Sequence, residues 1–566
     1  MAGAQDKLGE LLHGLHRSMA AALHVAMSLM YSLSRAYAQH QVKERVERSR
    51  RALRCGAGKA WRRAVAAAVP ARPLFMHILY FIAISVFGYG LLGELKVRDP
   101  DRSPSGIDRL FIAVSAATVS SMSTVEMEVF SNGQLLVLTV LMFIGGEVFV
   151  SLLELASKWS KLRKQAIDKS RRVESHGELE LQDEPVIAYN TVDVENLTSI
   201  TSTTTEEARS PMDANMLRSN AVRALFYIVL AILVVVHVLG AIAVAAYMYA
   251  SPGARQTLRG KSLNLWTFAV FTTVSTFSSC GFMPTNENMI VFKRDAPLQL
   301  LLVPQALVGN TLFPPLLAAC VWAAAAATRR DELVELARKG RAMAAGFYHL
   351  LPARRCWMLT ATVGALLAAQ VALVCAMEWG GALQGMSRWE KMVNALFLAV
   401  NSRHTGESTV DLSTLAPAIL VLFVFMMYLP PYTTWFPFEE NSGAKDHAAE
   451  NQAIRSLKTT VLSQLSYLTI FVIAICIIER RKLEEDPLNF SVLSIVVEVV
   501  SAYGNVGFSM GYSCSRQINP DGLCVDRWTG FVGRWSDSSK VLLIVVMFFG
   551  RLKKFSMNGG EAWILS

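Results

Sequence analysis

The chain is short of charged residues and lacks the common catalytic motifs. Only 18% of its 566 residues are charged, whereas average soluble proteins carry roughly 25%. It contains no His-Glu-x-x-His zinc motif, no phosphate-binding P-loop and no Gly-x-Ser-x-Gly nucleophile elbow. The ten histidines are scattered along the chain. We therefore expect a protein that is not an enzyme and that needs no cofactor.

Cysteine is also scarce, with eight residues in the whole chain. Cys320, Cys375 and Cys476 stand singly in apolar runs, where cysteine behaves as a small hydrophobic residue. This spacing does not indicate a disulfide scaffold or a cysteine metal site. Cys514 and Cys524 differ, because they lie in a polar segment that we expect in an oxidising compartment. Either a disulfide joins them or both are free thiols.

Long apolar runs account for the shortage of charge. About 20 consecutive apolar residues cross a bilayer core as a helix. Backbone groups in lipid must be paired within the segment, so each run predicts a helix. The sequence predicts an all-α integral membrane protein with eight such spans, at residues 74–95, 132–155, 221–250, 296–328, 356–378, 412–436, 459–480 and 539–560.

The net charge of +10 does not indicate nucleic-acid binding, because the basic residues cluster beside the spans. The clusters are Lys43–Arg63, Lys158–Arg172 and Arg329–Arg355. Lys and Arg accumulate in cytoplasmic loops, which predicts a multi-pass protein with both termini in the cytoplasm. The short connections 96–106, 251–262 and 379–388 then lie outside. Residues 480–482 are basic yet fall outside, against this rule.

Half-length apolar segments lie between the spans, at about 107–120, 263–280, 389–405 and 489–506. Each is too short to cross the bilayer and predicts a re-entrant pore helix. The chain thus divides into four membrane-pore-membrane repeats around a central pore. We expect a basic cytoplasmic N-terminal extension (1–70), pore units at 71–155, 221–328, 356–436 and 459–566, and cytoplasmic linkers at 156–220, 329–355 and 437–458.

Each half-length segment ends in a short polar turn, and four such turns can form one ring. A ring of backbone carbonyls can replace the water around a monovalent cation. The candidate filter positions are Ser121, Gly281, Gly406 and Gly507. Glycine reaches positive φ without a steric penalty, whereas a residue with a Cβ atom pays roughly 1–2 kcal/mol. Ser121 therefore breaks the symmetry of the ring, which would cost K+ more than a partly hydrated Na+.

Charged residues near these turns form two further groups of candidates. Glu126, Glu128, Glu287 and Glu407 follow the turns, and acidic side chains at an outer mouth would concentrate cations. Glu147 and Arg551 fall inside predicted spans, where charges face a bundle interior. These two residues could form a pair, or Arg551 could extend from the membrane toward the cytoplasm. Pro304, Pro314 and Pro315, together with Gly309, predict a kink in the span 296–328.

The turn sequences resemble those of the plant high-affinity potassium transporter (HKT) family, within the Trk/Ktr/HKT group. The resemblance runs from about residue 74 to the end, and its motifs are ATVSSMSTVEME (117–128), CGFMPTNENM (280–289), NSRHTGE (401–407) and YGNVGF (503–508). It implies four membrane-pore-membrane units in one chain, one pore per protomer and a homodimer. Serine at the first filter position is similar to the sodium-selective class I members of the family.

The resemblance implies a passive, Na+-selective transporter in the plasma membrane, with Na+ held by the filter carbonyls. The alternative within the same fold is a K+-permeable or Na+/K+-coupled transporter. A polytopic membrane enzyme is the third hypothesis, and the missing catalytic motifs argue against it.

Overall fold

The computed structural model describes residues 73–180, 211–434, 464–518, 522 and 524–556. Leu74–Ser566 form one compact unit. Helices and turns make up the part of the chain that is described, which has no strand. The predicted all-α fold is therefore confirmed. The N-terminal extension, the linker 437–458 and the last ten residues lie outside the described residues.

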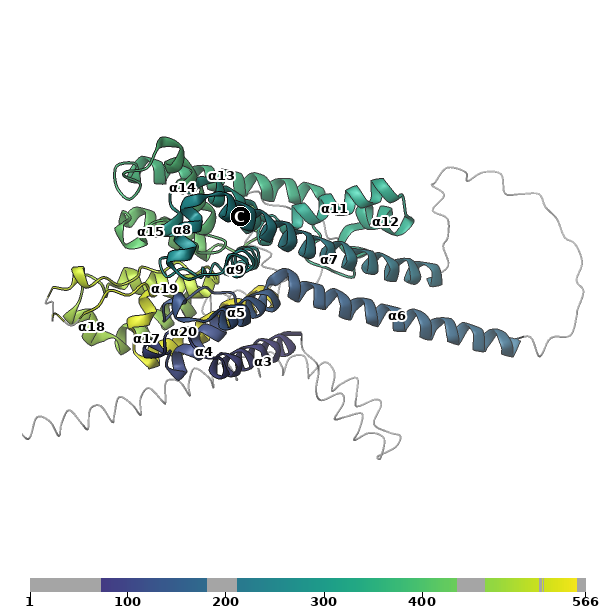
Figure 1. The fold of residues 1–566 in the computed structure, drawn as a ribbon. Coiled ribbons are helices and arrows are strands. Elements are labelled where there is room, and N and C mark those ends of the chain that lie inside the picture. The colour runs from purple at the N-terminus through teal and green to yellow at the C-terminus, as the bar shows by residue number, and fades with distance from the viewer. Residues whose placement is uncertain (1–72, 181–210, 435–463, 519–521, 523, 557–566) are drawn as a thin grey trace, which may run out of the picture. The chain divides into compact units, whose positions relative to one another are not determined.

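The helices repeat in four groups, and each group has a half-length helix of 12–14 residues between two other helices (Figure 1). The first group contains α3 (Pro73–Glu94), α4 (Gly106–Ala117), α5 (Asn132–Gly145) and α6 (Glu147–Glu180). The second contains α7 (Pro211–Ala250), α8 (Pro252–Gly260), α9 (Leu265–Phe277), α10 (Ala296–Gly309) and α11 (Phe313–Thr328). After α12 (Asp331–Lys339), the third contains α13 (Ala353–Glu378), α14 (Arg388–Asn401) and α15 (Pro417–Tyr428). The fourth contains α17 (Gln464–Ile478), α18 (Arg480–Glu485), α19 (Val492–Gly504) and α20 (Asp537–Ser556).

The half-length helices α4, α9, α14 and α19 share one kind of N-terminus. A polar side chain caps each first turn by accepting a hydrogen bond from a backbone N–H. The caps are Ser105, Asn264, Ser387 and Ser491. At Ser387 the carboxylate of Glu390 completes the cap, because it accepts a hydrogen bond from the backbone N–H of Ser387. These caps fix where each half-length helix starts, and each helix then ends at one of the four polar turns.

Some of the helices that flank the half-length ones are long enough to cross a membrane, and others are shorter. By length and composition, α3, α7 and α13 are each long and apolar enough to cross a bilayer, as are the bent pairs α5–α6 and α10–α11. Within the described residues α15 and α17 are shorter apolar helices. The two bends measure 53° and 81°. The predicted kink is confirmed, but it falls after Gly309, while Pro304 stays inside α10.

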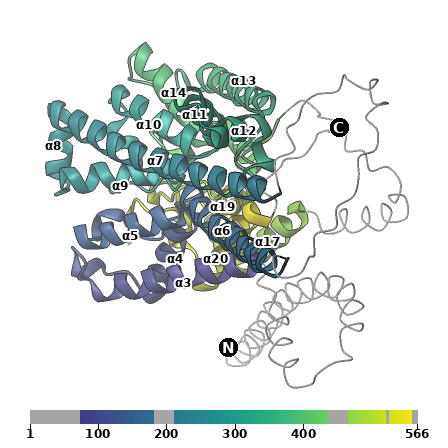
Figure 2. The same cartoon turned by 90° about the vertical axis from the view of Figure 1, so that its right-hand side faces the viewer.

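The four groups pack in a closed cycle. Each group contacts the next through α5 and α9, α10 and α14, α15 and α19, and finally α20 and α4. The colour gradient in Figure 2 follows the same order, from the purple first group through teal and green to yellow. Helices α6 and α7 also run side by side (Figure 1). This cycle brings the C-terminal ends of the four half-length helices together.

Candidate selectivity filter and outer mouth

The four candidate filter residues lie in direct contact, in the order of the four groups. A methyl group added to Gly281 would overlap the carbonyl oxygen of Thr405, in the third turn. One added to Gly406 would overlap the carbonyl of Val506, in the fourth turn. Each glycine is therefore pressed against the carbonyl that precedes the filter position of the next group.

Ser121 closes this ring between the fourth and second turns. A methyl group added to Gly507 would overlap the Cβ atom of Ser121 and lie 2.8 Å from its Oγ and 3.1 Å from the carbonyl oxygen of Ser120. The Ser121 Oγ is also 3.4 Å from a methyl group built on Gly281. The one side chain of the ring thus fills space beside both neighbouring glycines.

All four residues adopt positive φ angles: 53° at Ser121, 86° at Gly281, 73° at Gly406 and 104° at Gly507. The sequence argument for glycine at these positions required this conformation. Ser121 adopts it despite its Cβ atom, at a cost of roughly 1–2 kcal/mol. The surrounding contacts must hold Ser121 in place.

Hydrogen bonds to the helix ends hold three of the turns in the same way. The backbone N–H groups of Ser120, Cys280 and Val506 donate to the carbonyls of Ser115, Ser275 and Ser501, at 2.8, 2.9 and 3.0 Å. In the third turn the N–H of Gly406 donates to the carbonyl of Asn401 at 3.0 Å. In the third turn the same hydrogen-bonded loop is thus shifted by one residue relative to the filter position.

Three glycines behind the turns were not singled out as functional by the sequence. Methyl groups on Gly145, Gly309 and Gly550 would overlap the carbonyl oxygens of Ala117, Phe277 and Tyr503, respectively. Each of these carbonyls belongs to the residue four positions before the filter position of the same group. The sequence signal that could have revealed them is a glycine in the span that follows the filter turn, present in three of the four groups.

Three of the four acidic residues of the predicted outer mouth, Glu126, Glu128 and Glu287, are engaged in ion pairs. Arg102 contacts Glu126 at 3.0 Å, and Glu126 also accepts a hydrogen bond from the backbone N–H of Trp528 at 3.2 Å. Lys261 contacts Glu128 at 2.6 Å and Glu287 at 2.5 Å. Burial alone would lower the pKa of Lys261, but its hydrogen bonds to the two carboxylates outweigh burial and raise the pKa above the usual value. These acids do not form an unneutralised ring.

Glu407 lies apart from the other three acids. Its side chain is fully buried, and its Oε1 accepts a hydrogen bond from Thr276 of α9 at 2.6 Å. The equivalent residues in the other turns, Met122, Phe282 and Phe508, are apolar and buried. Glu407 is thus buried against α9 and is not exposed to solution; its predicted role at the outer mouth stays a prediction.

Arg551 is buried inside the protein, with 1% of its surface exposed. Its guanidinium donates to the carbonyl oxygen of Gly145 and lies 5.5 Å from the ring centre of Phe81. Glu147, the suggested partner, begins α6 two residues after Gly145 and is also buried. Arg551 therefore does not extend toward the surface, and it joins α20 to the bend between α5 and α6.

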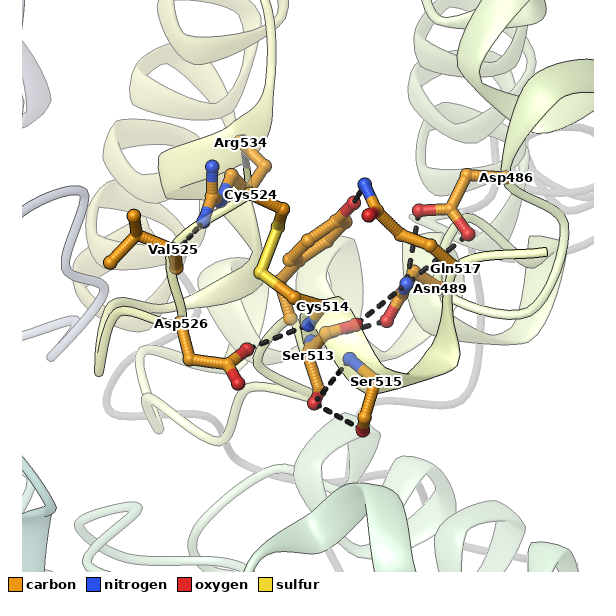
Figure 3. The surroundings of a disulfide bond; sticks show 11 residues. Asp486, Asn489, Ser513, Cys514, Ser515, Gln517, Cys524, Val525, Asp526 and Arg534 are labelled. Carbon is orange, nitrogen blue, oxygen red and sulfur yellow. Dashed lines mark hydrogen bonds between the residues drawn. A yellow bond between two sulfur atoms is a disulfide. The ribbon is translucent and has the colours of Figure 1, made fainter. Parts of the chain in front are cut away.

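Cys514 and Cys524 are joined by a disulfide, with their Cα atoms 5.8 Å apart (Figure 3). The backbone N–H of Cys514 donates to the carboxylate of Asp526 at 2.6 Å. After this loop the chain returns to the mouth, where the N–H of Gly530 donates to the carbonyl of Ser123 at 3.0 Å. The disulfide therefore belongs to a segment that packs beside the first turn.

Comparison with known proteins agrees with this architecture. The family model TrkH, described as "Cation transport protein", matches residues 185–434 and 447–558. The "Probable cation transporter HKT1;4" of Oryza sativa subsp. japonica is 78% identical over 87% of this chain and 98% of its own length. The chain belongs to the plant HKT family of cation transporters.

Other relatives of this transporter differ in the cation after which they are named. "Sodium transporter HKT1" of Arabidopsis thaliana is 44% identical over 83% of this chain and 91% of its own length. "Cation transporter HKT2;4" of Oryza sativa subsp. japonica is 36% identical over 85% of this chain and 92% of its own length. The crystal structure of the potassium transporter TrkH from Vibrio parahaemolyticus aligns with a TM-score of 0.47 and 15% identity, over 86% of this chain and 83% of that one. The transporter is a multi-pass membrane protein that carries cations, and it is not an enzyme.

Proposed function

We propose that this transporter moves Na+ selectively and passively across the plasma membrane, through a filter formed by Ser121, Gly281, Gly406 and Gly507. The observation that carries the proposal is the contact of the four residues in one ring with a single side chain in it. The backbone carbonyls of this ring would hold the ion. The proposal also includes cytoplasmic termini and a homodimer with one pore in each protomer.

Selectivity for Na+ follows from the space that Ser121 occupies. Its Cβ and Oγ fill the gap beside Gly507 and Gly281, so the four carbonyls cannot be equivalent. A K+ ion that loses its water needs a full set of well-placed oxygens in return. Na+ holds its water more firmly and can pass partly hydrated. The 78% identity to HKT1;4, against 36% to HKT2;4, supports placing the chain with class I members of the family.

Voltage clamp of oocytes that express the transporter tests this proposal. With bath Na+ and K+ varied separately, the reversal potential should follow Na+ and ignore K+. The variant Ser121→Gly should admit K+, because it removes the only side chain of the ring. Ser121→Ala is the matched control: it keeps the Cβ atom and should still exclude K+.

Two results would count against the proposal. If the wild-type reversal potential follows both ions, the K+-permeable alternative holds. If Ser121→Gly still excludes K+ while the protein reaches the surface, Ser121 does not determine selectivity.

A further inference from the structure

Lys261 joins two loops that follow different filter turns. It is the residue after α8, and its ammonium group contacts Glu128 of the first group and Glu287 of the second. Asn286 connects the same loops, since its backbone N–H donates to Glu128 Oε1 at 3.0 Å and its side-chain oxygen accepts from the Glu128 N–H at 2.8 Å. The three charged side chains are between 16% and 23% exposed, so small ions in solution can reach them.

The position of the ammonium matches that of a bound divalent cation. Its nitrogen lies 2.6 Å from one carboxylate oxygen and 2.5 Å from an oxygen of the other carboxylate. Ca2+ takes about 6–8 oxygen ligands at about 2.3–2.6 Å, among them carboxylates and waters. The two acids therefore converge on one point, and Lys261 supplies the positive charge at that point.

Backbone hydrogen bonds keep Lys261 next to both loops, and the two carboxylates hold its ammonium group. Its N–H donates to the carbonyl of Thr257 in α8 at 3.1 Å. Its carbonyl accepts a hydrogen bond from the Arg98 guanidinium at 3.2 Å, and the N–H of Arg98 donates to the carbonyl of Val129, next to Glu128, at 2.9 Å. A mobile ion would have to displace a cation that is covalently attached and positioned from both sides.

We propose that Lys261 is a tethered cation that keeps divalent cations from binding between Glu128 and Glu287 at the outer mouth. This inference rests on the proposed function for the placement of these loops on the outer side. Without the ammonium, two carboxylates would face each other unneutralised and would take up a hard divalent ion such as Ca2+. Arg102 differs, because its side chain is 57% exposed and its two partners, Glu126 and Asp99, contact different guanidinium nitrogens.

The test compares Na+ currents of the wild type and Lys261→Met over a series of bath Ca2+ concentrations. Weak extracellular Ca2+ sites have dissociation constants of about 0.1–1 mM. We expect the Lys261→Met current to change by at least half between Ca2+-free and about 1 mM Ca2+ baths, while the wild-type current stays constant. Arg102→Met is the matched control and should show no such dependence, because its partners Asp99 and Glu126 contact different nitrogens of the guanidinium, at 3.6 and 3.0 Å, and do not converge on one point. Adding Glu128→Gln to Lys261→Met should abolish the Ca2+ effect.

A second variant restores the charge within the same protein. In Lys261→Cys, aminoethyl methanethiosulfonate attaches a side chain that ends in an ammonium group. The Ca2+ effect should then disappear, whereas the negatively charged sulfonatoethyl reagent should leave it in place. The wild type treated with both reagents controls for the other cysteines.

Binding is also measured directly on purified protein, without any current. Addition of Ca2+ should raise the thermal unfolding midpoint of Lys261→Met, or of Lys261→Gln should that variant express better, but not that of the wild type. If neither variant responds to Ca2+ in current or in thermal midpoint, the inference is overturned. A wild type without Na+ current would overturn the proposed function, while the Ca2+-dependent midpoint would still report on Lys261.

Discussion

Replacing Gly550 by alanine measures what the close approach of α20 to the end of α19 contributes. A methyl group at this position would overlap the carbonyl oxygen of Tyr503 and lie 2.7 Å from its carbonyl carbon and 3.0 Å from its Cα. Alanine is favoured over glycine inside a helix by about 1 kcal/mol. Overpacking costs about 1–3 kcal/mol, and the backbone of Tyr503 cannot rotate away as a side chain would. We expect the variant to be less stable than the wild type by up to about 2 kcal/mol.

Gly364→Ala is the matched control, because Gly364 also lies inside an apolar helix, α13, but a methyl group there would meet nothing within 4 Å. This variant should keep the wild-type stability or gain up to about 1 kcal/mol. The assay is thermal unfolding of the purified protein in detergent, combined with Na+ and K+ reversal potentials in oocytes. Tyr503 stands four residues before Gly507, so Gly550→Ala should also change the ratio of Na+ to K+ permeability. Equal stability and selectivity in both variants would refute the reasoning.

Two further predictions concern the fourth group. Burial would raise the pKa of Glu479, but hydrogen bonds from Lys482 and Ser536 lower it below its usual value of 4.5. The stability that this carboxylate provides should be complete above pH 4.5 and lost as the pH falls through the lowered pKa. The thermal unfolding midpoint of Glu479→Gln should therefore depend less on pH in this range than that of the wild type. An identical pH dependence in both proteins would contradict this. Replacing Cys514 and Cys524 by serine should lower the free energy of unfolding by about 3 kcal/mol for a loop of this length, measured by denaturant titration; no change would mean that the disulfide does not restrict the unfolded chain.

The helical repeat could be predicted from the sequence, because the length of each apolar segment distinguishes a membrane span from a half-length helix. The half-length segment expected at 107–120 is helix Gly106–Ala117, and the one expected at 263–280 is Leu265–Phe277. The sequence did not reveal that α6 continues to Glu180 through a segment expected to be linker. In α6, Glu154 and Lys158 form an ion pair at 2.8 Å. Opposite charges four residues apart stabilise a helix that is exposed to water. The boundaries of the pore units and linkers stay a prediction.

The ring positions were readable because positive φ favours glycine, but the partners of charged side chains were not. No sequence pattern connects Lys261 to Glu128, 133 residues away in the chain. Glu407 is buried and accepts a hydrogen bond from Thr276 of another group, so its turn considered alone suggested an exposed acid. The carbonyls beside Gly145, Gly309 and Gly550 were hidden for the same reason, since a close backbone approach involves two segments.

The single side chain of the ring limits which substitutions can follow it in evolution. Any residue other than glycine at position 507 would collide with Ser121. At Gly281 and Gly406 an added side chain would instead collide with the backbone carbonyl of the next turn. A change at position 507 therefore depends on a prior change at position 121. The two positions are coupled sterically, so a chain that keeps serine at position 121 has one fewer way to alter its ring.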